Sequence, residues 1–130
     1  MKRFTNKYVL ISANMIWIAI IFILCTMPSK DIPKSGFEIP HLDKVVHFGL
    51  FFILSLLLLT TFKLHSSFTK KQSYFIVFLI ALGFGGTIEI LQQEFFNRAC
   101  EFGDLVADTM GGVASFFFFP FIKGFLKIKS

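Results

Sequence analysis

The sequence predicts an all-α protein, an integral membrane four-helix bundle formed by a single domain over residues 1–130. Hydrophobic residues make up 55% of the chain and charged residues 16%, whereas soluble domains carry about 25% charged residues. The mean hydropathy is +0.72. Four apolar stretches of about 18–20 residues each match a hydrocarbon core about 30 Å thick. These features exclude an ordinary soluble globule, a disordered chain and a disulfide-rich secreted domain.

The four expected helices cover residues of about 8–27, 42–62, 72–96 and 104–122. Helices are expected because a lipid interior offers no water to the polar groups of the backbone. The first stretch follows basic residues, as a signal peptide does, but its apolar run exceeds the roughly 7–15 residues of a signal core. We therefore expect it to be retained as a helix. The short connections make successive helices antiparallel neighbours.

Basic residues fix the expected orientation of these helices. Nine of the thirteen Lys and Arg residues precede the first helix, separate the second from the third, or follow the fourth. The positive-inside rule then places both termini in the cytoplasm. All-helical spans fit a bacterial inner (cytoplasmic) membrane. The net charge of +5 follows from this topology and attraction to anionic lipid, so we expect no nucleic-acid partner.

Glycines in the third and fourth stretches are expected to let helix backbones approach closely. They are Gly83, Gly85, Gly86, Gly111 and Gly112. Two cysteines, Cys25 and Cys100, fall near the outer face. We favour two separate thiols over a disulfide, which an oxidising compartment would also allow.

Polar residues stand at the outer ends of the last three apolar stretches, at one depth in the bilayer. Ionisable groups at that depth cost several kcal/mol unless they meet one another or water. We therefore expect them to face inward and to line an outward-facing polar pocket. The expected pocket residues are Asp43, Lys44, His47, Glu89, Gln92, Gln93, Arg98, Asp104 and Asp108.

Two of these residues have alternative interpretations. Arg98 either neutralises the carboxylates around it or holds an anionic group in bidentate fashion. His47 is either a packed, hydrogen-bonded histidine or the acid/base partner of Asp43, which lies one helical turn earlier. Clusters of His and carboxylates also bind divalent ions, but nothing in the spacing specifies a metal. We expect no metal and no cofactor.

Two stretches resemble the VanZ-like family of small membrane proteins. The run Leu42–Gly49 reads Leu-Asp-Lys-Val-Val-His-Phe-Gly and resembles that family's Asp-Lys-x-x-His-Phe signature. The second half resembles the family's pattern of spaced polar residues. The matching positions are Glu89, Gln92, Arg98, Glu101, Asp104, Asp108 and Gly111. Trp17 is similar to a recurrent tryptophan, and the resemblance covers nearly the whole chain.

The resemblance implies a small helical membrane bundle and an association with resistance to glycopeptide antibiotics, especially teicoplanin. The sequence departs from the family at two positions. Phe51 stands where the family often has a tyrosine, so any role of that hydroxyl is absent. Asp108 stands where many members have asparagine, which adds a negative charge and puts a neutral amide role in doubt.

Three functions remain open at this point. The favoured one is a non-enzymatic envelope protein whose pocket engages an amphiphile: a membrane lipid, a lipid-linked envelope precursor or a lipoglycopeptide. Arg98 then contacts an anionic group, and Gln92 and Gln93 supply hydrogen bonds. The second is a membrane enzyme acting on a lipid-linked substrate, with His47, Asp43 and Glu89 as candidate catalytic residues. The third is a structural scaffold. Homo-oligomerisation is compatible with all three.

Overall fold

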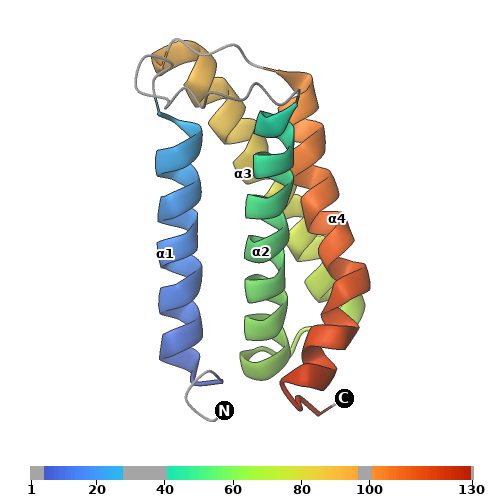
Figure 1. Ribbon diagram of the computed structural model, residues 1–130. Helices are drawn as coiled ribbons and strands as arrows, with labels where there is room; N and C mark the ends of the chain where they lie inside the picture. The colour runs from blue at the N-terminus through green and yellow to red at the C-terminus, as the bar shows by residue number, and fades with distance from the viewer. Residues whose placement is uncertain (1–4, 28–40, 97–100, 130) are drawn as a thin grey trace.

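The computed structural model describes residues 5–27, 41–96 and 101–129. Within these residues the chain forms four α-helices: α1 (Lys7–Cys25), α2 (Leu42–His65), α3 (Lys70–Phe95) and α4 (Phe102–Phe125). Successive helices run in opposite directions, so the start of α1 and the end of α4 lie at the same end of the bundle (Figure 1). The predicted all-α four-helix architecture is confirmed.

α2, α3 and α4 extend past the apolar runs that predicted them, whereas α1 ends at Cys25, two residues before the expected end. α2 continues through Lys63 to His65, although the apolar run ends at Phe62. The hydrogen bonds of a helix join backbone groups and do not depend on apolar side chains. A charged residue such as Lys63 therefore indicates where the hydrocarbon core ends, not where the helix ends. α3 begins at Lys70 because Thr69 and Gln72 form a capping box, in which each side chain binds the other's backbone N–H.

α2 is the central helix and packs most closely against α4. A Cβ atom on Gly111 of α4 would overlap with the backbone oxygen of Phe48 and would lie 3.0 Å from the backbone nitrogen of Phe52. A Cβ on Gly112 would lie 3.1 Å from the Cβ of Ala81 on α3. The close approach predicted at both glycines is confirmed, and it lets α4 pack against two helices at once.

The same prediction is wrong for Gly83 and Gly86 of α3. A Cβ on either residue would meet nothing within 4 Å. Gly85, which lies between them in the sequence, is buried. Residues adjacent in a helix point about 100° apart, so only some glycines in such a run can face a neighbouring helix. The sequence alone does not show which of them do.

Two side-chain hydrogen bonds attach α1 to α2. The Nε1 of Trp17 donates to the backbone oxygen of Leu50 at 2.9 Å. The Nδ2 of Asn14 donates to the Oγ1 of Thr61, also at 2.9 Å. Apolar contact alone drives helix association only weakly in lipid, where such interhelical bonds are worth about 0.6–2 kcal/mol. The recurrent tryptophan of the family therefore has a structural role here.

The outer surface of the bundle is apolar. All four helices are long and apolar enough to cross a membrane. Phe117, Phe121 and Phe125 on α4 are 72%, 76% and 80% exposed. Large exposed apolar surfaces of this kind are unfavourable in water and favourable against lipid chains. The chain is a multi-pass membrane protein.

Replacement of Gly111 by alanine should destabilise the bundle, because the added methyl group would overlap with the backbone of α2. Overpacking of this kind costs about 1–3 kcal/mol. We expect a lower thermal unfolding midpoint for Gly111→Ala in detergent. Gly49→Ala on α2 is the matched control, since a Cβ there meets nothing within 4 Å. Equal midpoints for the two variants would contradict the close α2–α4 contact.

The orientation of the bundle remains a prediction from the distribution of basic residues. Both termini should be cytoplasmic. A phosphatase fused after Ser130 should therefore be inactive in bacterial cells, whereas a fluorescent protein at the same position should mature. Phosphatase activity from this fusion would reverse the assignment of the two faces.

Candidate functional site

Three helices bring charged side chains together at the end of the bundle where α2 and α4 begin and α3 ends (Figure 1). His47 lies in the second turn of α2, Glu89 lies in the last two turns of α3, and Asp104 and Asp108 lie in the first two turns of α4. The antiparallel order of the helices therefore places residues far apart in the sequence at one level. We name these four residues the buried cluster.

His47 and Asp108 form the innermost contact of the buried cluster. The Nδ1 of His47 lies 2.8 Å from the Oδ1 of Asp108. The two residues are 3% and 0% exposed. This contact joins α2 to α4 at a distance typical of a hydrogen bond between a ring nitrogen and a carboxylate.

Of the two interpretations of His47, the packed and hydrogen-bonded histidine agrees with the structure, and pairing with Asp43 does not. Asp43 instead contacts Lys44, with 3.3 Å between its Oδ2 and the Nζ of Lys44. Asp43 lies in the first turn of α2 and is exposed, whereas His47 lies one turn deeper and faces α4. Sequence spacing shows which residues share a helix face, but the rotation of that helix against its neighbours decides the partner.

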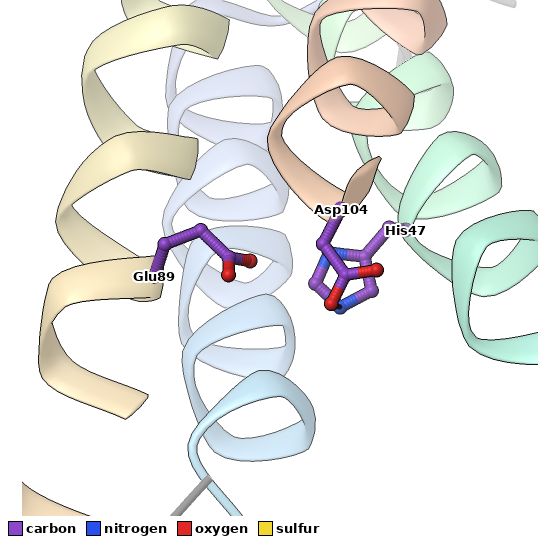
Figure 2. A group of neighbouring side chains, drawn as sticks. All are labelled: His47, Glu89 and Asp104. Carbon is purple, nitrogen blue, oxygen red and sulfur yellow. Dashed lines mark ion pairs between the residues drawn. The ribbon is translucent and has the colours of Figure 1, made fainter. Parts of the chain in front are cut away.

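Glu89 and Asp104 complete a triangle with His47. Figure 2 shows the carboxylate of Glu89 directed toward the other two side chains. One nitrogen or oxygen atom from each residue lies within 4.8 Å of the others. The Nε2 of His47 is 4.0 Å from the Oδ2 of Asp104. The Oε2 atom of Glu89 accepts a hydrogen bond of 3.1 Å from the backbone N–H of Glu101.

An outer rim of three partly exposed side chains covers the buried cluster. Its residues are Asp43, Lys44 and Glu101, whose side chains are 43%, 29% and 49% exposed. The Nζ of Lys44 lies 2.6 Å from the Oε2 of Glu101 and 3.4 Å from the Oδ1 of Asp104. Glu101 was not among the expected pocket residues. Its match to the family's pattern of spaced polar residues, three residues before Asp104, is the signal that would have identified it.

The remaining predicted pocket residues lie elsewhere. The side-chain nitrogen of Gln92 is buried and donates to the backbone oxygen of Cys25 on α1, and the Cys25 side chain interacts with the His47 ring. Gln93 is exposed on α3. Arg98 and Cys100 fall outside the described residues, so the structure does not address the role of Arg98 or pairing of the cysteines.

Acidic groups outnumber basic groups in this region. Among the described residues, five carboxylates (Asp43, Glu89, Glu101, Asp104 and Asp108) surround Lys44 and His47. Two buried carboxylate oxygens, Oε1 of Glu89 and Oδ2 of Asp108, have no hydrogen-bond partner within the described part of the chain. A buried, unpaired oxygen of this kind is costly.

The buried cluster is closed to solvent. His47, Glu89 and Asp104 are each 3% exposed, and Asp108 is fully buried. A cavity of about 160 Å³ lies at the opposite end of the bundle, where Lys63, Lys70 and Lys123 contribute to its lining. A large ligand arriving from outside can therefore reach the outer rim directly, but not the cluster beneath it.

Gly85 of α3 supports Asp108, and a side chain there should disturb the cluster. A Cβ on Gly85 would lie 2.7 Å from the Oδ2 of Asp108, which is buried and has little room to move. We expect Gly85→Ala to lower the unfolding midpoint, since overpacking costs about 1–3 kcal/mol. Gly86→Ala, which meets nothing within 4 Å, should leave it unchanged or raise it. The Gly85→Ala penalty should shrink in an Asp108→Ala background, and an unchanged penalty would place its cause elsewhere.

A comparison with protein families places this arrangement among known proteins. The family described as VanZ/LLP1 matches residues 3–123, which include the four helices almost to the end of α4. No curated protein and no solved structure matches the chain. The resemblance of the sequence to VanZ-like proteins is thereby confirmed, and the chain belongs to the VanZ/LLP1 family.

Proposed function

We propose that the protein acts at the outer face of the bacterial cytoplasmic membrane, where its outer rim engages the polar head group of an amphiphile. Through this contact it alters susceptibility to teicoplanin-type glycopeptides. The observation that carries the proposal is the convergence of α2, α3 and α4 on one cluster of acidic residues and a histidine at one end of the bundle.

The surroundings of the outer rim suit a ligand that has both a polar and an apolar part. Val45 follows Lys44 and is 64% exposed, and Phe102 follows Glu101 and is 78% exposed. A head group can therefore contact the rim while its acyl chain lies along α2 or α4. Membrane lipids, lipid-linked envelope precursors and lipoglycopeptides all have this construction.

The charges of the outer rim favour particular head-group chemistry. The carboxylates of Asp43 and Glu101 accept hydrogen bonds from hydroxyl and amino groups, which sugar-containing head groups carry. Lys44 supplies a positive charge for an anionic group. Arg98 is proposed to supply a second positive charge and to bind the anionic group through two hydrogen bonds. Gln93 is exposed and available as a further donor, whereas the Gln92 amide nitrogen already binds α1.

Substitution of Lys44 tests the role of the outer rim. In a strain deleted for the native gene, wild-type protein should raise the teicoplanin minimum inhibitory concentration. Lys44→Met should still accumulate in the membrane yet lose that increase. The closest bridge of Lys44, to Glu101 at 2.6 Å, joins two partly exposed groups, and such bridges contribute only about 0–1 kcal/mol to stability, whereas the bridge to the buried Asp104 is longer, at 3.4 Å. Lys63→Met, at the other end of α2, should behave as the wild type.

The measurements are immunoblots of membrane fractions and antibiotic susceptibility of the same cultures. A Lys44→Met protein with normal abundance and full resistance would exclude the rim as the functional surface. Loss of resistance in proportion to lost protein would favour a structural scaffold. A deletion with no effect on glycopeptide susceptibility would remove that part of the proposal.

A second candidate, an enzyme acting on a lipid-linked substrate, is favoured by the contact between His47 and Asp108. A carboxylate at Nδ1 orients the ring and leaves Nε2 to transfer a proton. Purified protein should then turn over a lipid-linked envelope substrate, and His47→Gln should lose turnover while retaining binding. Binding without turnover by the wild type would favour the first function.

A further inference from the structure

We propose that His47, Glu89 and Asp104 bind one divalent transition-metal cation, zinc(II) or manganese(II), between α2, α3 and α4. The proposal goes beyond the engagement of a head group, because the cation lies in the buried cluster beneath the outer rim. It is bound whether or not an amphiphile occupies that rim. Neither the spacing of the residues in the sequence nor the family match assigns this site.

The geometry at His47 is that of a metal-binding histidine. Metal-ligating histidines almost always donate their other ring N–H to a carboxylate or carbonyl group, which fixes the tautomer and the ring orientation. Here Asp108 occupies Nδ1 at 2.8 Å. This contact fixes the ring, whose second nitrogen, Nε2, lies 4.0 Å from the Oδ2 of Asp104, with the Cys25 side chain also interacting with the ring. Asp108 is therefore the orienting residue rather than a ligand.

The distance between His47 and Asp104 suits a shared cation better than a direct hydrogen bond. The Nε2 of His47 is 4.0 Å from the Oδ2 of Asp104, which is too long for a hydrogen bond. Two ligands of one cation, with metal–ligand bonds of about 2.0–2.2 Å, lie roughly 3–4 Å apart. The Oδ1 of Asp104 faces Lys44 at 3.4 Å, so Oδ2 remains for the cation.

Glu89 supplies the independent indication of a ligand. Its side chain is buried, and its Oε1 has no hydrogen-bond partner within the described residues. The carboxylate is directed toward His47 and Asp104 in Figure 2. The three ligand atoms lie within 4.8 Å of one another. Side-chain rotations that move these atoms by about 1 Å therefore bring them to metal-binding distances.

Within the described part of the chain, the charge of the buried cluster also favours a bound cation. Glu89, Asp104 and Asp108 are three buried carboxylates at one end of a membrane-spanning bundle. Lys44 contacts only Asp104 among them and also pairs with Asp43 and Glu101. Uncompensated charges within a membrane cost several kcal/mol. A divalent cation compensates two of them at once.

The mixture of ligands selects the class of metal. One imidazole nitrogen with two carboxylate oxygens fits zinc or manganese better than magnesium or calcium, which prefer oxygen ligands alone. A second acidic group, formed by Asp43, Glu101 and Asp104, also lies within range of a metal. The Nζ of Lys44 already contacts all three of its carboxylates, and we assign no cation there.

Metal titration of the full-length, tag-free protein in detergent tests the site. After removal of metals with a chelator, manganese(II) is added and the free ion is followed by electron paramagnetic resonance. Zinc(II) is then added as a competitor. We expect one manganese per chain, displaced by zinc. Glu89→Gln preserves size and the hydrogen bond to Glu101, and should weaken binding at least about 10-fold.

Glu94→Gln is the matched control, since Glu94 is an exposed residue on the same helix. It should bind manganese as the wild type does. Thermal unfolding gives a second measurement: manganese should raise the midpoint of the wild type and of Glu94→Gln but not that of Glu89→Gln. If Glu89→Gln does not fold, manganese binding by Asp104→Asn and the shift in the unfolding midpoint of the wild type on addition of manganese replace it as the test.

Three results would overturn the proposal. The wild type could bind neither ion, or Glu89→Gln could bind manganese as tightly as the wild type. A Glu89→Gln protein more stable than a wild type that binds no metal would show that the buried carboxylates carry protons instead. Each outcome is distinct from failure of the rim to engage an amphiphile, because Lys44→Met leaves the three ligands intact.

Discussion

The contact between His47 and Asp108 is the interaction on which the polar end of the bundle depends. It joins α2 to α4 at 2.8 Å in a region of almost no exposure. Because Asp108 fixes the ring of His47, the second ring nitrogen, Nε2, faces the carboxylate of Asp104, and the carboxylate of Glu89 lies close to both. Without that contact, His47 and Asp108 would each be a buried polar group with no partner on the facing helix, which is costly within a membrane.

The fold was predictable from hydropathy, because spans of this length have one stable form in lipid. The membership of the cluster was largely predictable as well, since His47, Glu89 and Asp108 interrupt otherwise apolar runs. The partner of His47 within the cluster was not predictable. Asp43 shares a helix face with His47, but the side chain that reaches His47 comes from α4. The rotation of one helix against another depends on close contacts such as Gly111 against Phe48, which no local pattern encodes.

The departure at position 108 has a physical meaning in this structure. A carboxylate binds the ring of His47 with one oxygen, and its second oxygen packs over Gly85. An asparagine of the same shape would preserve the packing but contribute no negative charge. The aspartate therefore makes the buried cluster more acidic, and so increases its need for protons or a cation. Phe51, by contrast, is fully buried and packs against the ring of Phe84, so position 51 contributes apolar contact to the core.

The separation of His47 from its partner also bears on biosynthesis. Asp108 follows His47 by 61 residues, so α2 leaves the ribosome well before α4 exists. Until the last helix has inserted, the histidine must stay near the lipid head groups or water. The polar end of the bundle is therefore completed only when α4 has inserted beside α2 and α3.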